Sequence, residues 1–135
     1  MGEQRIMHVA LADDWEGCLR FGEYDVSTLA TPFDDTGHIH ATTRARLPGV
    51  LDRIYGHLTL PLLLVVLDER ALTDAGIGVT WHPTGSGERV PRILGPFPME
   101  APIVVMTIPL ERQDNHWIAP DLSSLSVRNH APASP

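Results

Sequence analysis

The chain has 135 residues, of which 43% are hydrophobic, and a formal net charge of −7. This length can form one domain with a buried core, and the composition is that of a globular protein. The acidic balance argues against nucleic acids and anionic membranes as partners, because both attract basic surfaces. The ten basic residues are all arginines, which excludes pyridoxal-type catalysis and P-loop phosphate transfer, since both require a lysine.

The cysteine content and the hydropathy of the chain indicate the cellular compartment of the protein. One cysteine, Cys18, excludes an internal disulfide and a cysteine-based zinc site. The N-terminal residues show no secretory apolar region, and the longest apolar run, Leu60–Leu67, is less than half of what a membrane crossing requires. We therefore expect a cytoplasmic protein.

Both helices that the sequence predicts lie in the first half of the chain. Its expected elements are a strand, a helix, a long connection, a short strand and a second helix, at residues 5–11, 12–22, 23–35, 38–42 and 43–55. The second helix has a clean apolar stripe, although Pro48 moves its expected start toward Arg46. The long connection attracts attention because loops of this length are often functional.

The second half predicts strands. Their expected positions are residues 60–67, 77–81, 90–95 and 103–110. Residues 68–76 are expected to turn back, and residues 83–87 to form a hairpin loop. Two early helices followed by mostly late strands indicate a single α+β domain over residues 1–120. Residues 121–135 are rich in Ser and Pro, so we expect a disordered tail there.

A histidine pair is the most informative local pattern. In a strand, His38, His40 and Thr42 would project from one side and could bind a metal, move protons or hold an anion. A metal needs three or four ligands, yet no acidic residue follows until Asp52. His8, His57 and His82 are candidate third ligands, but nothing in the sequence places them nearby. We therefore predict no metal.

Further candidate residues each have a structural alternative. His8 lies in the first strand, where a histidine is usually a hydrogen-bonded core residue unless it is functional. Arg92 lies among apolar neighbours and needs a carboxylate, a carbonyl or an anionic ligand. Its structural alternative is an ion pair with Glu88 or Glu100.

Short motifs of the chain resemble, in the same order, those of a bacterial family known as domain of unknown function 952. The matching segments are Met7–Val9, Trp15, Gly22–Tyr24, Gly37–Thr42 and Val90–Pro96. The resemblance spans roughly residues 5–120 and implies a fold similar to ADP-ribosyltransferases, in which a split sheet holds a ligand cleft. It further implies an NAD-like ligand near His8, His40 and Thr42.

The chain departs from the family pattern at four positions, one of which is Val90 in place of a family Phe. His38 stands where the family usually has Phe, so that His40 corresponds to the family histidine. Arg92 replaces a later family histidine. His82 follows Trp81 where family members tend to carry Glu, and this departure counts against NAD chemistry.

Three functions are compatible with these residues. The first is a small-molecule enzyme without metal or cofactor, in which His8, His40 and His38 act as acids or bases and Arg92 holds an anion. Its reaction is an isomerisation, cyclisation, elimination or hydrolysis. The other expected ligand contacts are Trp15, Tyr24, Thr42, Thr43 and His82. The second function is ADP-ribosyl or related glycosidic transfer from NAD, and the third is a non-catalytic module that binds a small molecule or a protein.

Overall fold

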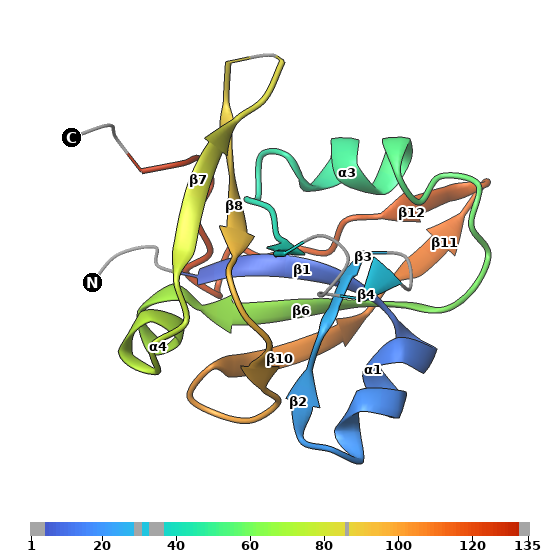
Figure 1. The fold of residues 1–135 in the computed structure, drawn as a ribbon. Coiled ribbons are helices and arrows are strands. Elements are labelled where there is room, and N and C mark those ends of the chain that lie inside the picture. The colour runs from blue at the N-terminus through green and yellow to red at the C-terminus, as the bar shows by residue number, and fades with distance from the viewer. Residues whose placement is uncertain (1–4, 29–30, 33–36, 86, 133–135) are drawn as a thin grey trace.

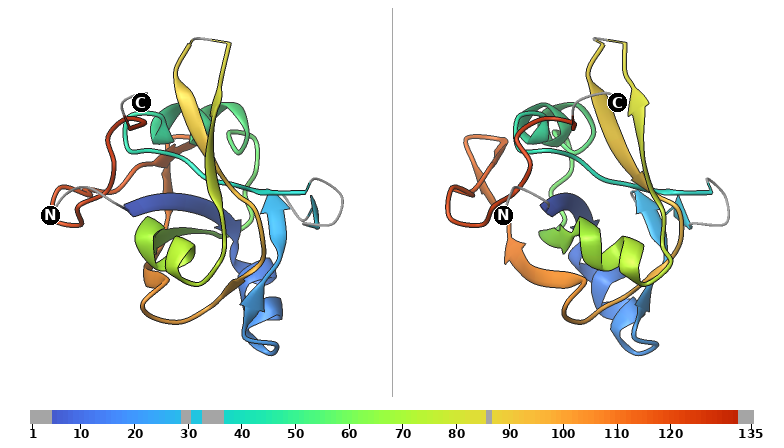
Figure 2. Two further views of the ribbon diagram at one scale, coloured as in Figure 1. Left: turned by 60° about the vertical axis from the view of Figure 1, so that its left-hand side comes forward. Right: turned by 90° about the vertical axis from the view of Figure 1, so that its left-hand side faces the viewer.

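Two three-stranded antiparallel sheets form the framework of the protein (Figure 1). The computed structural model describes residues 5–28, 31–32, 37–85 and 87–132. The first sheet has the order β1–β6–β10, with bounds Arg5–Leu11, Leu62–Asp68 and Val104–Pro109. The second has the order β5–β8–β7, with bounds Ile39–His40, Arg89–Ile93 and Val79–Pro83. The β7–β8 hairpin crosses the first sheet, as the views of Figures 1 and 2 show.

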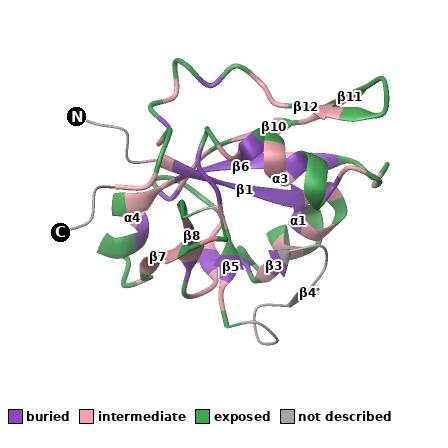
Figure 3. Cartoon of the chain, turned by 90° about the horizontal axis from the view of Figure 1, so that it is seen from above, coloured by how far each residue is buried: buried purple, intermediate pink, exposed green. Residues whose placement is uncertain are grey.

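The central strand β6 explains the position of the two cores. Its sequence LLLVVLD is apolar at nearly every position, which is typical of a strand buried on both faces. Val65 and Leu67 contribute to one core, whereas Leu64 and Val66 contribute to the other. Figure 3 shows β1 and β6 as the most continuously buried part of the chain.

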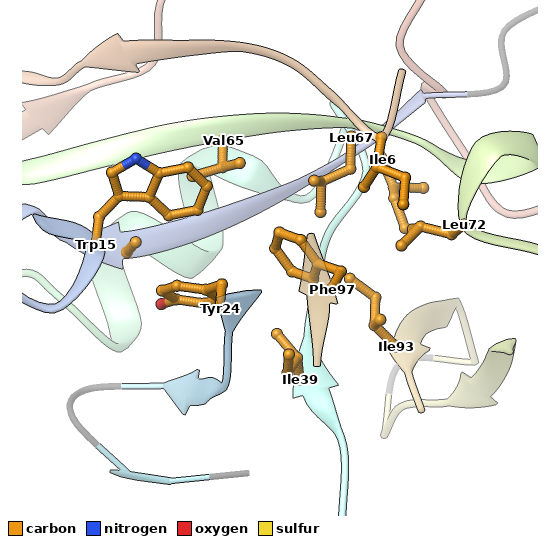
Figure 4. Close-up of a cluster of buried hydrophobic side chains, with 11 residues drawn as sticks. Ile6, Trp15, Tyr24, Ile39, Val65, Leu67, Leu72, Ile93 and Phe97 are labelled. Atoms are coloured by element: carbon orange, nitrogen blue, oxygen red, sulfur yellow. The ribbon is translucent and has the colours of Figure 1, made fainter. Parts of the chain in front are cut away.

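The core on the side of the second sheet contains three large aromatic residues in contact (Figure 4). Trp15, Tyr24 and Phe97 pack with tilted rings, the Trp15–Tyr24 and Tyr24–Phe97 centroids lying 5.1 Å and 5.4 Å apart. Ile39 and Ile93 come from paired positions of β5 and β8 and close this core from the second sheet.

Three helices cover the sheets in the described residues. They are α1 (Ala12–Leu19), α3 (Leu47–Arg53) and α4 (Glu69–Asp74). The early two were expected, and α3 starts beside Pro48 because proline fits the first turn of a helix. The third was expected only as a turn. Asp68 caps it by accepting a hydrogen bond from the Ala71 backbone N–H at 2.9 Å.

Three short strand pairs complete the described secondary structure. They are β2 with β9 (Glu23–Tyr24 with Phe97–Pro98), β3 with β4 (Val26–Thr28 with Thr31–Pro32) and β11 with β12 (Glu111–Gln113 with His116–Ile118). The connection expected over 23–35 therefore contains strands. Its residues 29–30 and 33–36 lie outside the described residues.

Residues 121–132 pack on the domain, whereas the sequence led us to expect a disordered tail from residue 121 onward. Leu122 and Val127 are buried in the core beside α3. The Arg128 backbone N–H donates to the Arg5 carbonyl at 2.8 Å, and the Arg128 carbonyl accepts from the Arg44 N–H at 2.8 Å. The Ser- and Pro-rich composition concealed these apolar anchors, and residues 133–135 lie outside the described residues.

The α+β class expected from the sequence is confirmed. The chain is a small α+β domain with few helices and several antiparallel sheets. Across the described ranges, no helix has the length and apolar character needed to cross a membrane.

Candidate functional site

The outer face of the second sheet carries a row of polar side chains. His40 of β5 is directly opposite Arg92 of β8, and Arg92 is directly opposite Thr80 of β7. Directly opposed residues in an antiparallel sheet share a face, so these three side chains project together. The neighbours Ile39 and Ile93 point to the opposite face and enter the core. The strand alternation thus separates a polar outer face from an apolar inner face.

His40 is the most accessible titratable group in this row. Its side chain is exposed. Among the described residues, none forms a hydrogen bond with its ring nitrogens, and only its backbone carbonyl is engaged, by His8. Partial burial lowers the pKa of His40, and the neighbouring charges of His38 and Arg92 lower it further. The neutral imidazole is therefore favoured near neutral pH, which is the form that accepts a proton.

His38 provides a second imidazole beside the first. The two rings meet edge to face, with centroids 4.5 Å apart. Because like charges disfavour one another, two protonated imidazoles at this distance would repel. Protonation of both rings at once is therefore disfavoured.

Arg92 is a guanidinium without a carboxylate partner among the described residues. Its Nε is buried and has no hydrogen-bond partner there. The sequence had suggested Glu88 or Glu100 as a partner, but Glu88 instead lies 3.5 Å from Arg46. A partly buried guanidinium donates up to five hydrogen bonds and is costly to leave unsatisfied, so it favours an anionic ligand.

A cavity of about 210 Å³ lies beside His40, between β1, α3 and the β7–β8 hairpin. Its apolar lining comes mainly from Met7, Val9, Val50, Ile54, Tyr55 and Val90. His40, Arg46 and Arg53 contribute polar side chains to it. No Asp or Glu belongs to the lining within the described residues. A chain of net charge −7 thus places three of its ten arginines at or beside this cavity, counting Arg92.

Arg46 connects the two walls of the cavity. It precedes α3, and its Nη1 lies 3.5 Å from the carboxylate of Glu88, which lies in the hairpin loop just before β8. Tyr55 links the end of α3 to β1, the third wall of the cavity, because its hydroxyl donates to the Val9 carbonyl at 3.2 Å. These contacts give the cavity a defined shape in the free protein.

His8 contributes to the lining of the cavity, and both of its ring nitrogens are engaged. Nδ1 lies 2.6 Å from the His40 carbonyl oxygen and Nε2 lies 2.8 Å from the Tyr24 hydroxyl. A carbonyl can only accept, so Nδ1 carries the proton and Nε2 accepts from the Tyr24 O–H. Burial lowers the pKa of His8 to about 4. We predicted acid–base catalysis by His8, but this geometry favours a structural residue that holds β1 against β5.

Trp15 and Tyr24 were expected to contact a ligand, and the structure places both in the core. They are 6% and 1% exposed and pack against Phe97 (Figure 4). The Tyr24 hydroxyl is directed at His8, and burial raises its pKa. Neither side chain lines the cavity. Both fill the core because the α1–β2 connection folds their large apolar rings inward.

The three remaining predicted contacts lie at different depths. Thr42 lines the cavity, but its backbone pairs with Met7 and its hydroxyl donates to the Thr43 carbonyl at 3.3 Å. Thr43 is 1% exposed and does not line the cavity. His82 shares the polar sheet face, where its Nε2 lies 2.8 Å from the Thr80 hydroxyl.

The described residues contain no cluster of three or more His, Cys, Asp or Glu side chains able to hold a metal. His57 and His82 do not join the His38–His40 pair in such a cluster. Three further cavity residues were not expected from the sequence, namely Arg46, Arg53 and Tyr55. Arg46 and Arg53 look like ordinary surface arginines beside the second predicted helix, and Tyr55 continues its apolar stripe after Leu51, so none of the three gave a signal of a ligand site.

The comparisons with known proteins agree with the fold. The family model described as "Protein of unknown function (DUF952)" matches residues 9–105. The crystal structure of protein CC0527 from Caulobacter crescentus superposes with a TM-score of 0.71 at 16% identity, covering 90% of this chain and 97% of that one. The solution NMR structure of CC0527 gives a TM-score of 0.65 over 90% and 95% of the two chains. None of the curated proteins compared with the chain matches it.

Proposed function

We propose that this chain, which belongs to the DUF952 family, is a small-molecule enzyme in which His40 transfers protons and Arg92 holds an anionic group of the substrate. One observation carries the proposal. The guanidinium of Arg92 has no carboxylate partner in the described part of the chain and lies directly opposite an accessible histidine whose pKa is lowered.

The two side chains have complementary tasks. Neutral His40 accepts a proton from the substrate and returns it to another atom, which typically accelerates a reaction by about 10²–10⁴-fold. Arg92 neutralises the negative charge of the substrate and any charge that develops during proton transfer. His8 is a positioning residue, because it binds the carbonyl of His40 and not the substrate.

The resemblance to ADP-ribosyltransferases suggested NAD as a second ligand. A cavity of about 210 Å³ is smaller than the ~300–1,000 Å³ of a drug-sized ligand site and would enclose only part of a dinucleotide. Its described lining also lacks the carboxylate that would hold the ribose. These observations support a small acid over NAD.

The experiment is a turnover screen on the full chain, followed by ¹H NMR, with small carboxylic acids, 2-oxo acids and phosphate monoesters. We expect at least one compound to be converted, with a rate reduced at least ~100-fold in His40→Gln. Arg92→Gln should raise KM, whereas Arg70→Gln, an exposed arginine paired with Asp74, should not. Equal turnover by His40→Gln and the wild type would contradict the proposal. Binding without turnover would indicate a non-catalytic module.

A further inference from the structure

The cavity beside His40 is lined with more apolar surface than a binding site for a simple anion needs. Helix α3 directs Leu47 and Leu51 into the core, where each is 1% exposed. Val50 and Ile54 continue the apolar stripe at helical spacing but line the cavity instead. Across the cavity, Val90 of β8 faces them. These methyl groups surround a space that core side chains leave unfilled.

The charged groups of the cavity lie at two places on its wall. His40 lines the wall nearest Arg92, its partner across the strands. Arg46 and Arg53 lie at the α3 side, where the cavity continues into a wider polar depression that also includes Glu88. Arg46 is already paired with Glu88, whereas Arg92 has no carboxylate partner among the described residues. An anionic group therefore fits best beside His40 and Arg92, and a hydrocarbon group fits the apolar lining.

We infer that the cavity is an apolar subsite, and that the ligand of this protein is a small amphipathic acid with its anionic group at His40 and Arg92 and a compact hydrocarbon group between α3 and the β7–β8 hairpin. This inference rests on the proposed function for the position of the anionic group. It adds the chemical class of the remainder of the ligand.

The size of the cavity limits that hydrocarbon group. An apolar protein cavity of about 150 Å³ accommodates one benzene molecule. The volume of about 210 Å³ beside His40 therefore accommodates one aromatic ring or a branched alkyl chain of similar bulk. Two fused ring systems or a long acyl chain would extend into the polar depression, where they would desolvate Arg53 and Glu88.

The test uses three probes on the full chain, with binding measured by NMR titration. Acetate carries only the anionic group, benzyl alcohol carries the ring without the charge, and benzoate carries both. We expect benzoate to bind at least ~10-fold more tightly than acetate, because the ring leaves water. In the wild type, its ring protons should show intermolecular NOEs to the methyl groups of Val50 and Val90.

Two variants separate the subsite from the anion site. Val50→Phe fills the cavity, so benzoate affinity should fall to that of acetate while acetate affinity is unchanged. Arg92→Gln should weaken acetate and benzoate equally and leave benzyl alcohol unaffected. Leu19→Phe is the matched control, because it enlarges a side chain that is 51% exposed on α1 and should change none of these affinities.

The outcomes distinguish the two proposals. Acetate binding that depends on Arg92, with benzoate no tighter than acetate and no NOEs from its ring, would overturn the apolar subsite and leave the proposed function intact. Benzyl alcohol binding that Val50→Phe abolishes, without any binding of acetate that depends on Arg92, would support the subsite and contradict the anion site. The wild-type NOE measurement decides the first question even if Val50→Phe fails to fold.

Discussion

The buried histidine of the first strand provides a quantitative prediction of stability against pH. The ring of His8 is 1% exposed and engages the His40 carbonyl and the Tyr24 hydroxyl in its neutral form. Its pKa is lowered from 6.5 to about 4. Because the folded state binds the proton less readily than the unfolded state, the stabilisation is complete above pH 6.5 and declines as the pH falls toward 4.

The magnitude follows from the size of this change. At ~1.4 kcal/mol for each pH unit, lowering the pKa from 6.5 to about 4 corresponds to ~3 kcal/mol of unfolding free energy lost in acid. That is a large share of the ~5–15 kcal/mol that stabilises a typical domain. The prediction is therefore within the range of ordinary denaturation measurements.

The assay is urea unfolding of the wild type and His8→Gln at about pH 7 and about pH 4.5. Gln is neutral throughout, so the variant should be less stable at neutral pH but lose ~2 kcal/mol less between the two pH values, since the full ~3 kcal/mol is reached only below pH 4. His57→Gln, at an exposed histidine, is the control and should follow the wild type. Parallel losses in the wild type and His8→Gln would refute the reasoning. Should His8→Gln not fold, the ring ¹⁵N shifts of wild-type His8 at about pH 5 report the same neutral state.

Two further predictions concern the C-terminal segment and the histidine pair. Arg128→Gln removes an ion pair to Glu69 at 2.7 Å, whose side chains are 21% and 15% exposed, and a cation–π contact over Trp81. Its unfolding free energy, measured with urea, should fall by ~2 kcal/mol, and a fall below ~0.5 kcal/mol would show that the segment contributes little through this contact. His38→Phe should raise the pKa of His40 by removing the neighbouring imidazole charge, as measured by NMR titration, and a lower pKa would contradict this cause.

The α+β class and most of the long strands could be predicted because they depend on local patterns. The apolar run of residues 60–67 and the alternation around Arg92 identify strands from neighbouring residues alone. The helix α4 could also have been found, since Asp68 precedes it at a capping position. Its six residues are too few for a convincing apolar period.

The candidate site could be predicted only in part, because its residues meet through tertiary pairing. His40 and Arg92 were both identified, but their juxtaposition depends on the register of β5 and β8. The sequence could not show whether His8 was functional or structural, because its partner Tyr24 comes from another element. Ser and Pro around the buried Leu122 likewise obscured a segment that packs against the domain.

The pKa of His40, measured by NMR titration, tests the account most directly. In the free wild type it should lie below its ordinary value of 6.5, because partial burial and the charges of His38 and Arg92 oppose protonation. The pKa should rise in Arg92→Gln. In the wild type, saturating benzoate should raise it by about half a pH unit or more, because a bound carboxylate stabilises the imidazolium. A His40 that titrates at or above 6.5 in the free protein, with a pKa that neither Arg92→Gln nor benzoate changes, would contradict the account.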